Sequence, residues 1–116
     1  KKMSKLTEKI LCSIDYDACK AARRNNYMEY ENALKERNDL LIHLDENAIP
    51  MVYPLVTADY SIRKKLQGRR IFTATYWSNV LEWTKSTDFE YRVSNTLLPL
   101  PININQEQLH CVIKSL

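Results

Sequence analysis

The first third of the chain alternates apolar and charged residues at helical spacing. Apolar residues on one side of residues 4–13 predict a short helix, and Asp15 can cap a longer one over residues 16–37. The apolar positions of the longer helix lie close to one face: Cys19, Ala22, Tyr27, Tyr30, Ala33 and Leu34. We interpret the charged residues between them, which include Arg23 and Arg24, as its solvated side.

The pattern then changes to short apolar runs that are typical of strands. Residues 40–44 and 49–56 are the first two candidates, and residues 45–48 form a turn between them. The second run is apolar on both faces, which favours a central strand. Pro54 cannot donate to a sheet, so we expect an interruption or a sheet edge near it.

A helix over residues 59–67 follows, with Gly68 at its C-terminal stop, and a central strand over residues 70–75 comes directly after it. Thr87 and Glu90 have the spacing of a capping box for a helix that ends near residue 95. Prolines make residues 97–102 extended. A second capping signal at Asn105 and Gln108 opens a last helix to residue 116, with Leu109, Val112, Ile113 and Leu116 on its buried side.

Together these elements predict an α+β fold. We expect a small, mainly antiparallel sheet covered on one face by helices, with a long N-terminal helix. The 116 residues suffice for one domain, with residues 1–38 as a helical lead-in and residues 39–116 as the α+β core. The chain opens without an initiator Met, and we read it as a piece of a longer protein.

Composition narrows the classes of function. No apolar run approaches the roughly 18 residues of a membrane span, so no membrane association is expected. The three cysteines include no C-x-x-C pair, which favours reduced thiols and a cytoplasmic location. A net charge of +3 is too small to indicate nucleic acid. The single glycine excludes a glycine-rich phosphate loop.

The candidate chemistry gathers around residues 70–80, where aromatic residues stand beside turn formers. Five basic residues and no acidic one lie between residues 60 and 81, next to Tyr76 and Trp77. This run suits anion, nucleotide or RNA binding, but a solvated helix face explains it better. Trp83 is either an exposed contact residue or the cover of a side cluster. His43 and His110 lack the neighbours of a metal site or a nucleophile–base pair, and the chain shows no complete active site.

Several stretches resemble, in order, the C-terminal small domain of the DegT-like, PLP-dependent sugar aminotransferases, which have the aspartate-aminotransferase (type I) fold. Residues 15–30 are similar to the helix that leaves the large domain of that family, and residues 52–66 to its next strand and helix. Residues 96–113 resemble its closing leucine–proline strand and capped helix. Residues 71–79 stand where the family has a Gly-Ile run ending in His/Tyr-Tyr. Here Arg70 replaces the glycine, and Tyr76-Trp77 replaces the pair.

The resemblance implies an accessory domain that closes the substrate cleft of a PLP-binding large domain in the same protein. The Schiff-base lysine and the aspartate that pairs with PLP belong to that large domain, so this chain alone is expected to bind no cofactor and no metal. The substrate of the parent protein would be a nucleotide sugar. The cleft-facing residues would be Thr75, Tyr76, Trp77 and Asn79, with Arg70 meeting an anionic group.

Two other classes of function stay open. One is a free-standing interaction module, such as a homodimer that uses the helix over residues 16–37 and its tyrosines. The other is a nucleotide- or RNA-binding domain that uses residues 63–77. We rank the aminotransferase-like domain first, the interaction module second and the nucleic-acid-binding domain third.

Overall fold

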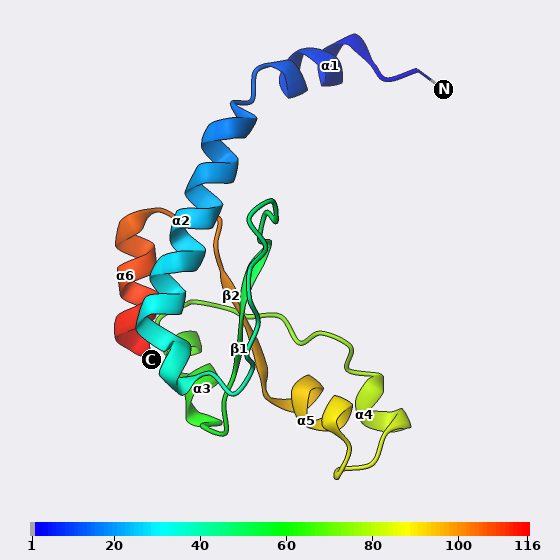
Figure 1. The fold of residues 1–116 in the computed structure, drawn as a ribbon. Helices are drawn as coiled ribbons and strands as arrows, with labels where there is room; N and C mark the ends of the chain where they lie inside the picture. The colour runs from blue at the N-terminus through cyan, green and yellow to red at the C-terminus, as the bar shows by residue number, and fades with distance from the viewer. Residues whose placement is uncertain (1) are drawn as a thin grey trace.

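The computed structural model describes residues 2–116 and has the predicted α+β class, with helices and one two-stranded antiparallel sheet (Figure 1). The elements in chain order are α1 (Lys5–Cys12), α2 (Tyr16–Leu34), the 3₁₀ turn η1 (Lys35–Arg37), β1 (Val52–Val56), α3 (Ser61–Gly68), α4 (Val80–Trp83), α5 (Phe89–Thr96), β2 (Leu97–Pro101) and α6 (Gln106–Ser115). The long predicted helix is therefore α2, extended by η1. No helix among residues 2–116 has the length and apolar content to cross a bilayer.

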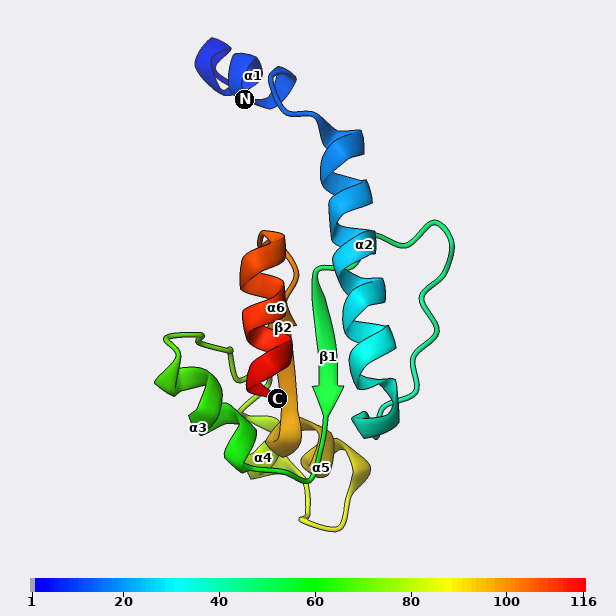
Figure 2. The ribbon, with the colours of Figure 1, turned by 90° about the vertical axis from the view of Figure 1, so that its left-hand side faces the viewer.

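Helices α2 and α6 lie side by side over one face of the sheet, as Figure 2 shows. The strands pair with Tyr53 opposite Leu100 and Leu55 opposite Leu98. Because side chains alternate across a strand, these four residues all point to the helical face, and all four belong to the core. Burial alternates from Val52 to Leu55 in β1, whereas Leu97–Leu100 of β2 are all buried.

Three prolines occupy the sheet without breaking its ladder. Pro54 lies directly opposite Pro99, and Pro101 opposite Val52. The carbonyl of Pro54 accepts from Asn38, and that of Pro101 from Tyr30, so both carbonyls point away from the partner strand. The N–H groups that proline lacks would have pointed outward at the same positions. The expectation of a sheet edge at Pro54 is confirmed, and the expectation of a central strand is wrong.

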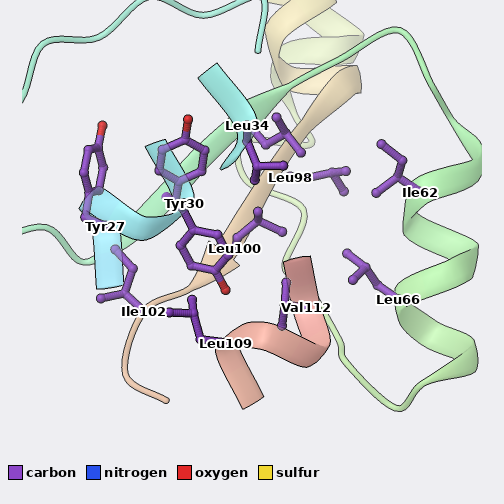
Figure 3. Packing of buried hydrophobic residues seen from close by; sticks show 12 residues of the cluster. Tyr27, Tyr30, Leu34, Ile62, Leu66, Leu98, Leu100, Ile102, Leu109 and Val112 are labelled. Atoms are coloured by element: carbon purple, nitrogen blue, oxygen red, sulfur yellow. The ribbon is translucent and has the colours of Figure 1, made fainter. Parts of the chain in front are cut away.

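Figure 3 shows the core that forms between the sheet and the helices. Tyr30 stacks on Tyr53 with ring centroids 5.4 Å apart, and Tyr27 meets Tyr53 edge-on at 5.0 Å. The other members are aliphatic and come from α2, the two strands, α3, α6 and the residue after β2: Leu34, Leu55, Ile62, Leu66, Leu98, Leu100, Ile102, Leu109 and Val112. The second half of α2, from Asn26 onward, is therefore part of the core and not only a lead-in to it.

Two predicted strands are absent. Residues 40–44 are irregular and do not pair with a strand, and Leu41 is 93% exposed. Residues 70–75 are also irregular. A third strand would need a free edge, but Pro99 and Pro101 leave β2 without outward N–H donors there. β-Branched and aromatic residues predicted a strand at residues 70–75, but the prolines of the neighbouring strand prevent it.

Helix α3 ends in a way that the sequence did not indicate. Gly68 lies inside the helix without a positive φ, and Arg70 takes the left-handed conformation with φ 61°. The Ile71 N–H donates to the Leu66 carbonyl, and the Arg70 N–H to the Gln67 carbonyl, both at 2.9 Å. These two bonds make a Schellman motif with Arg70 at the position that glycine usually takes. The predicted end of the helix at Gly68 is confirmed to within one residue, but the left-handed residue that closes it is Arg70.

The other helix ends follow their capping residues in most cases. Asp15 accepts from the Ala18 N–H at 3.0 Å, and the Asn105–Gln108 capping box forms as predicted. The box at Thr87 does not form, because Asp88 is the N-cap of α5 and its carboxylate accepts from the Lys85 N–H instead. The short helix α4 was not predicted.

Helix α1 and the first half of α2 project from the rest of the molecule as an arm (Figure 1). The radius of gyration is 16.9 Å, whereas a compact domain of this length has about 13 Å. No residue of α1 is buried. The apolar side of α1 that the sequence predicted therefore exists, but within this chain it faces solvent.

Candidate functional site

The predicted site residues lie in two places. Arg70 ends α3, whereas Thr75, Tyr76, Trp77 and Asn79 lie on the link that residues 71–79 form between α3 and α4. Figure 1 shows this link running past the strands to α4 and α5, which lie away from α2 and α6. Arg70 and Trp77 line two different hollows. The structure therefore does not bring Arg70 together with the aromatic pair.

Arg63, on α3, holds the link in place. Its guanidinium donates to the Thr73 carbonyl at 3.1 Å and the Thr75 hydroxyl at 3.3 Å, and its other nitrogen donates to the Leu97 carbonyl at 3.2 Å. The Thr73 hydroxyl is buried and has no partner within the chain. Arg63 was part of the candidate anion-binding run, but its donors are used to join α3, the link and β2.

Trp77, near the α4 end of the link, lines an aromatic hollow of about 350 Å³ together with residues of α4 and α5. Its backbone has φ 51°, a conformation that a bulky residue adopts only under constraint, and its carbonyl accepts from the Val80 N–H at the start of α4. Trp83 and Phe89 share the hollow, and the three rings are 62%, 75% and 58% exposed. Aromatic side chains, and Trp in particular, contribute much of the binding energy at protein interfaces.

Tyr76 supports this arrangement from the side. Its ring centroid lies 5.6 Å from that of Trp77 with the planes tilted by 59°, and it is only half-buried. Thr75 and Asn79 are exposed. The link thus presents Trp77 to solvent, with Tyr76 behind it and Thr75 tied to Arg63.

A second hollow, of about 360 Å³, lies between the end of α3 and α6. Arg69 and Arg70 stand at its rim, with Phe72 and Cys111 beside them. The Arg69 guanidinium lies 3.9 Å from the Cys111 sulfur. The floor of this hollow is aliphatic, and two arginine side chains stand at its edge.

Other chemistry that the residue types allow is not assembled here. Among residues 2–116, no three His, Cys, Asp or Glu side chains come together as a metal site would require. The His110 Nε2 lies 3.7 Å from the Glu29 carboxylate on the outer surface of α6 and α2. Cys12, Cys19 and Cys111 are all free thiols.

The perturbed ionisable groups lie outside both hollows, in the tyrosine cluster of the core and at the start of α3. Burial raises the pKa of Tyr30 well above its ordinary value. Burial also raises the pKa of Tyr53, and its hydroxyl donates to the Glu31 carboxylate at 2.8 Å. Hydrogen bonds from the hydroxyl and N–H of Ser61 lower the pKa of Asp59 at the start of α3. These shifts mark structural hydrogen bonding.

No model of a known protein family matches the chain, and no curated protein or solved structure matches it significantly. The functional interpretation therefore depends on the residues and their geometry.

Sequence reasoning found part of each hollow. It singled out Trp77 and Arg70. It left two interpretations of Trp83, as an exposed contact residue or as the cover of a side cluster. In the structure Trp83 is exposed and lines the aromatic hollow. Arg69 was part of the candidate anion-binding run and Phe72 lay in the aromatic stretch, whereas Phe89 and Cys111 were missed. Phe89 follows directly on the N-cap Asp88, at the start of a helix whose other side is buried, and an aromatic residue in that position was the available signal.

Proposed function

We propose that this chain is the small C-terminal domain of a PLP-dependent sugar aminotransferase-like protein, in which it closes the substrate cleft of a PLP-binding large domain. The parent protein would be cytoplasmic and would act on a nucleotide sugar. The ordered resemblance of residues 15–30, 52–66, 71–79 and 96–113 supports the family, and the α+β fold is compatible with it.

The observation that carries the proposal is the apolar arm. Six large side chains along it are between 39% and 69% exposed: Met3, Leu6, Ile10, Leu11, Ile14 and Tyr16. A cluster of large exposed apolar side chains on one short segment is typical of a contact with another protein surface. A domain that is completed by a second domain is expected to show such a surface when it is seen alone.

The conformation of Arg70 also supports the resemblance. The family has a glycine at this place, and the backbone here has φ 61°, which glycine adopts without steric cost. The need for a left-handed residue at the end of α3 explains why a glycine would be used there. In this chain an arginine takes the same backbone shape.

The residues present do not fit the PLP site itself. PLP, when bound, acts as the electron sink of transamination and is held by a Schiff base to a lysine in a desolvated pocket. Every lysine among residues 2–116 is exposed, so none of them suits this role. PLP would therefore be held by the large domain, and this chain would contribute walls to the cleft.

In this role the chain would close the substrate cleft and orient the substrate. The link with Trp77 would face the cleft, where its ring and those of Trp83 and Phe89 would exclude water from the reacting groups. Thr75 and Asn79 offer exposed polar groups beside these rings for hydrogen bonds to a sugar. Arg63 would keep the link in position while the domain moves as a unit.

The coding sequence on the N-terminal side of Lys1 in the native gene tests the proposal first. A PLP-lysine domain encoded there is the expected result, and a gene product without one overturns the proposal. In the full-length protein, reduction with borohydride should fix PLP on a lysine outside residues 1–116. PLP fixed specifically on a lysine within residues 1–116 would contradict the proposal as well.

A matched pair of variants then tests the arm. Leu6→Ser with Ile10→Ser should lower the transaminase activity of the full-length protein, because both side chains would lie in the contact with the large domain. Glu8→Ser with Lys9→Ser, also exposed residues of α1, should leave activity near that of the wild type. Neither pair should change the unfolding midpoint of the isolated chain, since no residue of α1 is buried.

A homodimer is the second candidate, because the same exposed arm suits a second copy of the chain. Tyr27 and Tyr30 are buried, so such an interface would use the apolar residues of α1 together with the exposed Tyr16. A stable symmetric dimer of the isolated chain at micromolar concentration, lost in the Leu6→Ser and Ile10→Ser variant, would favour this function. The RNA-binding alternative is weakened because the donors of Arg63 are used inside the chain.

A further inference from the structure

The hollow between the end of α3 and the face of α6 combines a basic rim with an apolar floor. Arg69 and Arg70 follow directly on the end of α3 at Gly68, and Cys111 and Val112 belong to α6. None of the residues that line the hollow is acidic. The nearest positive charges are thus not neutralised from within the cavity.

The two guanidiniums are free to take a ligand. Within residues 2–116 the side chain of Arg70 makes no hydrogen bond and no ion pair, and that of Arg69 reaches only the Cys111 sulfur, at 3.9 Å. This differs from Arg63, whose donors hold the link. Guanidinium groups without a carboxylate partner bind phosphate or carboxylate oxygens through paired, charge-assisted hydrogen bonds.

The apolar part of the hollow suits a flat ring. Phe72 is 75% exposed at its edge, and Ile104 and Val112 contribute the aliphatic floor. The volume of about 360 Å³ falls within the roughly 300–1,000 Å³ range of small-molecule sites. Arg70 also adopts its left-handed backbone here, and such constrained residues concentrate at ligand sites.

We propose that this hollow binds a small aromatic anion, with a flat ring against Phe72 and a phosphate or carboxylate held by Arg69 and Arg70. A nucleotide and an aromatic carboxylic acid share this chemistry. The site lies wholly within this chain, so it does not depend on a PLP-binding domain or on the proposed function.

The test uses the full chain with Cys12→Ser and Cys19→Ser, which leaves Cys111 as the only thiol. Both replaced cysteines are exposed, so the fold is expected to be retained. The probes are adenosine 5′-monophosphate and indole-3-acetate. Adenosine, which has the ring without the phosphate, and inorganic phosphate, which has no ring, serve as controls. The rate at which a thiol reagent modifies Cys111 reports occupancy of the hollow, and amide NMR shifts of Ile71, Phe72 and Gln108 report the location.

The expected result is that at least one of the two complete anions slows modification of Cys111 and shifts these amides, whereas the two controls bind far more weakly. Protection by the nucleotide alone assigns a phosphate ligand, and protection by indole-3-acetate alone assigns a carboxylate. Absence of protection by both anions at millimolar concentration overturns the proposal, as does equal protection by inorganic phosphate or by adenosine.

Arg70→Gly removes the guanidinium while suiting the left-handed backbone, so it should fold at least as well as the parent chain. It should weaken binding by about tenfold or more. Lys64→Ala removes one positive charge of α3 that does not line the hollow, and it should leave affinity nearly unchanged. Equal losses in the two variants would show that only net charge attracts the probe and would overturn the proposal.

Discussion

Two residues among those that the structure describes, Arg70 and Trp77, carry a left-handed backbone without being glycine. Each lines one of the two hollows, and each ends or begins a helix. Arg70 closes the Schellman motif of α3, and Trp77 turns the chain into α4. This conformation costs an ordinary residue about 1–2 kcal/mol, so the surrounding bonds must hold both residues in place.

Arg70→Gly is therefore expected to raise the free energy of unfolding of the isolated chain by about 1 kcal/mol, because glycine takes this conformation without a steric penalty. Urea unfolding followed by circular dichroism measures it. Arg69→Gly is the matched control. Arg69 has φ −97°, so glycine there should give no gain and some loss. A gain from Arg69→Gly, or a loss from Arg70→Gly, would contradict this account of how α3 ends.

At the scale of elements, the two-stranded sheet is supported by the helices packed on it and by the partners that its outer β1 edge finds. An isolated pair of strands is marginal in water. On the outer edge of β1, Asn38 accepts from the Val56 N–H at 3.0 Å and donates to the Pro54 carbonyl at 2.9 Å. The N–H of Asp39, the residue after Asn38, donates to the Val56 carbonyl at 2.8 Å. One amide side chain thus takes the place of a third strand.

Asn38→Leu should destabilise the chain by about 2 kcal/mol, because the Val56 N–H and the Pro54 carbonyl would both lose their partner. Chemical denaturation measures the loss, and amide hydrogen exchange at Val56 should become faster than in the wild type. Asn47→Leu, in the exposed turn before β1, serves as the control and should change stability by less than about 0.5 kcal/mol. Equal effects of the two variants would mean that Asn38 is not the edge partner.

The elements that the sequence predicted correctly are those whose signals are local. Helices α2 and α6 were located by their capping residues, Asp15 and Asn105, and by the spacing of their apolar residues. Strand β2 was located by its prolines. The strand predicted at residues 70–75 failed because pairing depends on a distant partner, and Pro99 and Pro101 remove the donors that it would need. The end of α3 at Gly68 was predicted, but the left-handed residue that closes the helix was not, because Arg70 and not the glycine holds that conformation.

The candidate site was predictable to a similar degree. Trp77 and Arg70 stood out by residue type, but their separation into two hollows is a tertiary fact. Arg63 could not be told from its basic neighbours, because only the folded chain shows that its donors reach Thr73 and Leu97. Cys111 joins Arg69 only through the packing of α6 beside α3.

At the scale of the whole molecule, the tyrosine cluster predicts a loss of stability at alkaline pH. Burial raises the pKa of Tyr30 and Tyr53 and, less strongly, of Tyr27, where the charge of Glu31 also contributes. The folded state then holds these protons more tightly than the unfolded state, whose tyrosines ionise near pH 10. Their contribution is complete below about pH 10 and is lost as the pH rises above that value.

The urea midpoint should therefore be insensitive to tyrosine ionisation up to about pH 9 and should fall steeply above pH 10. Ultraviolet absorbance should show that three of the seven tyrosines ionise only as the chain unfolds. Tyr53→Phe should reduce the slope of the alkaline loss, because one of the shifted groups is removed. All seven tyrosines titrating together while the chain stays folded would contradict the buried cluster.

The molecule as described over residues 2–116 consists of a packed core and an arm whose apolar side chains are exposed. The central claim is that another domain covers this arm. Hydrogen–deuterium exchange of the amides of α1 and the first half of α2 tests it most directly, by comparing the isolated chain with the full-length product of its gene at equal concentration. The account predicts fast exchange in the isolated chain and strong protection of the same amides in the full-length protein. Equal exchange in the two forms would contradict it.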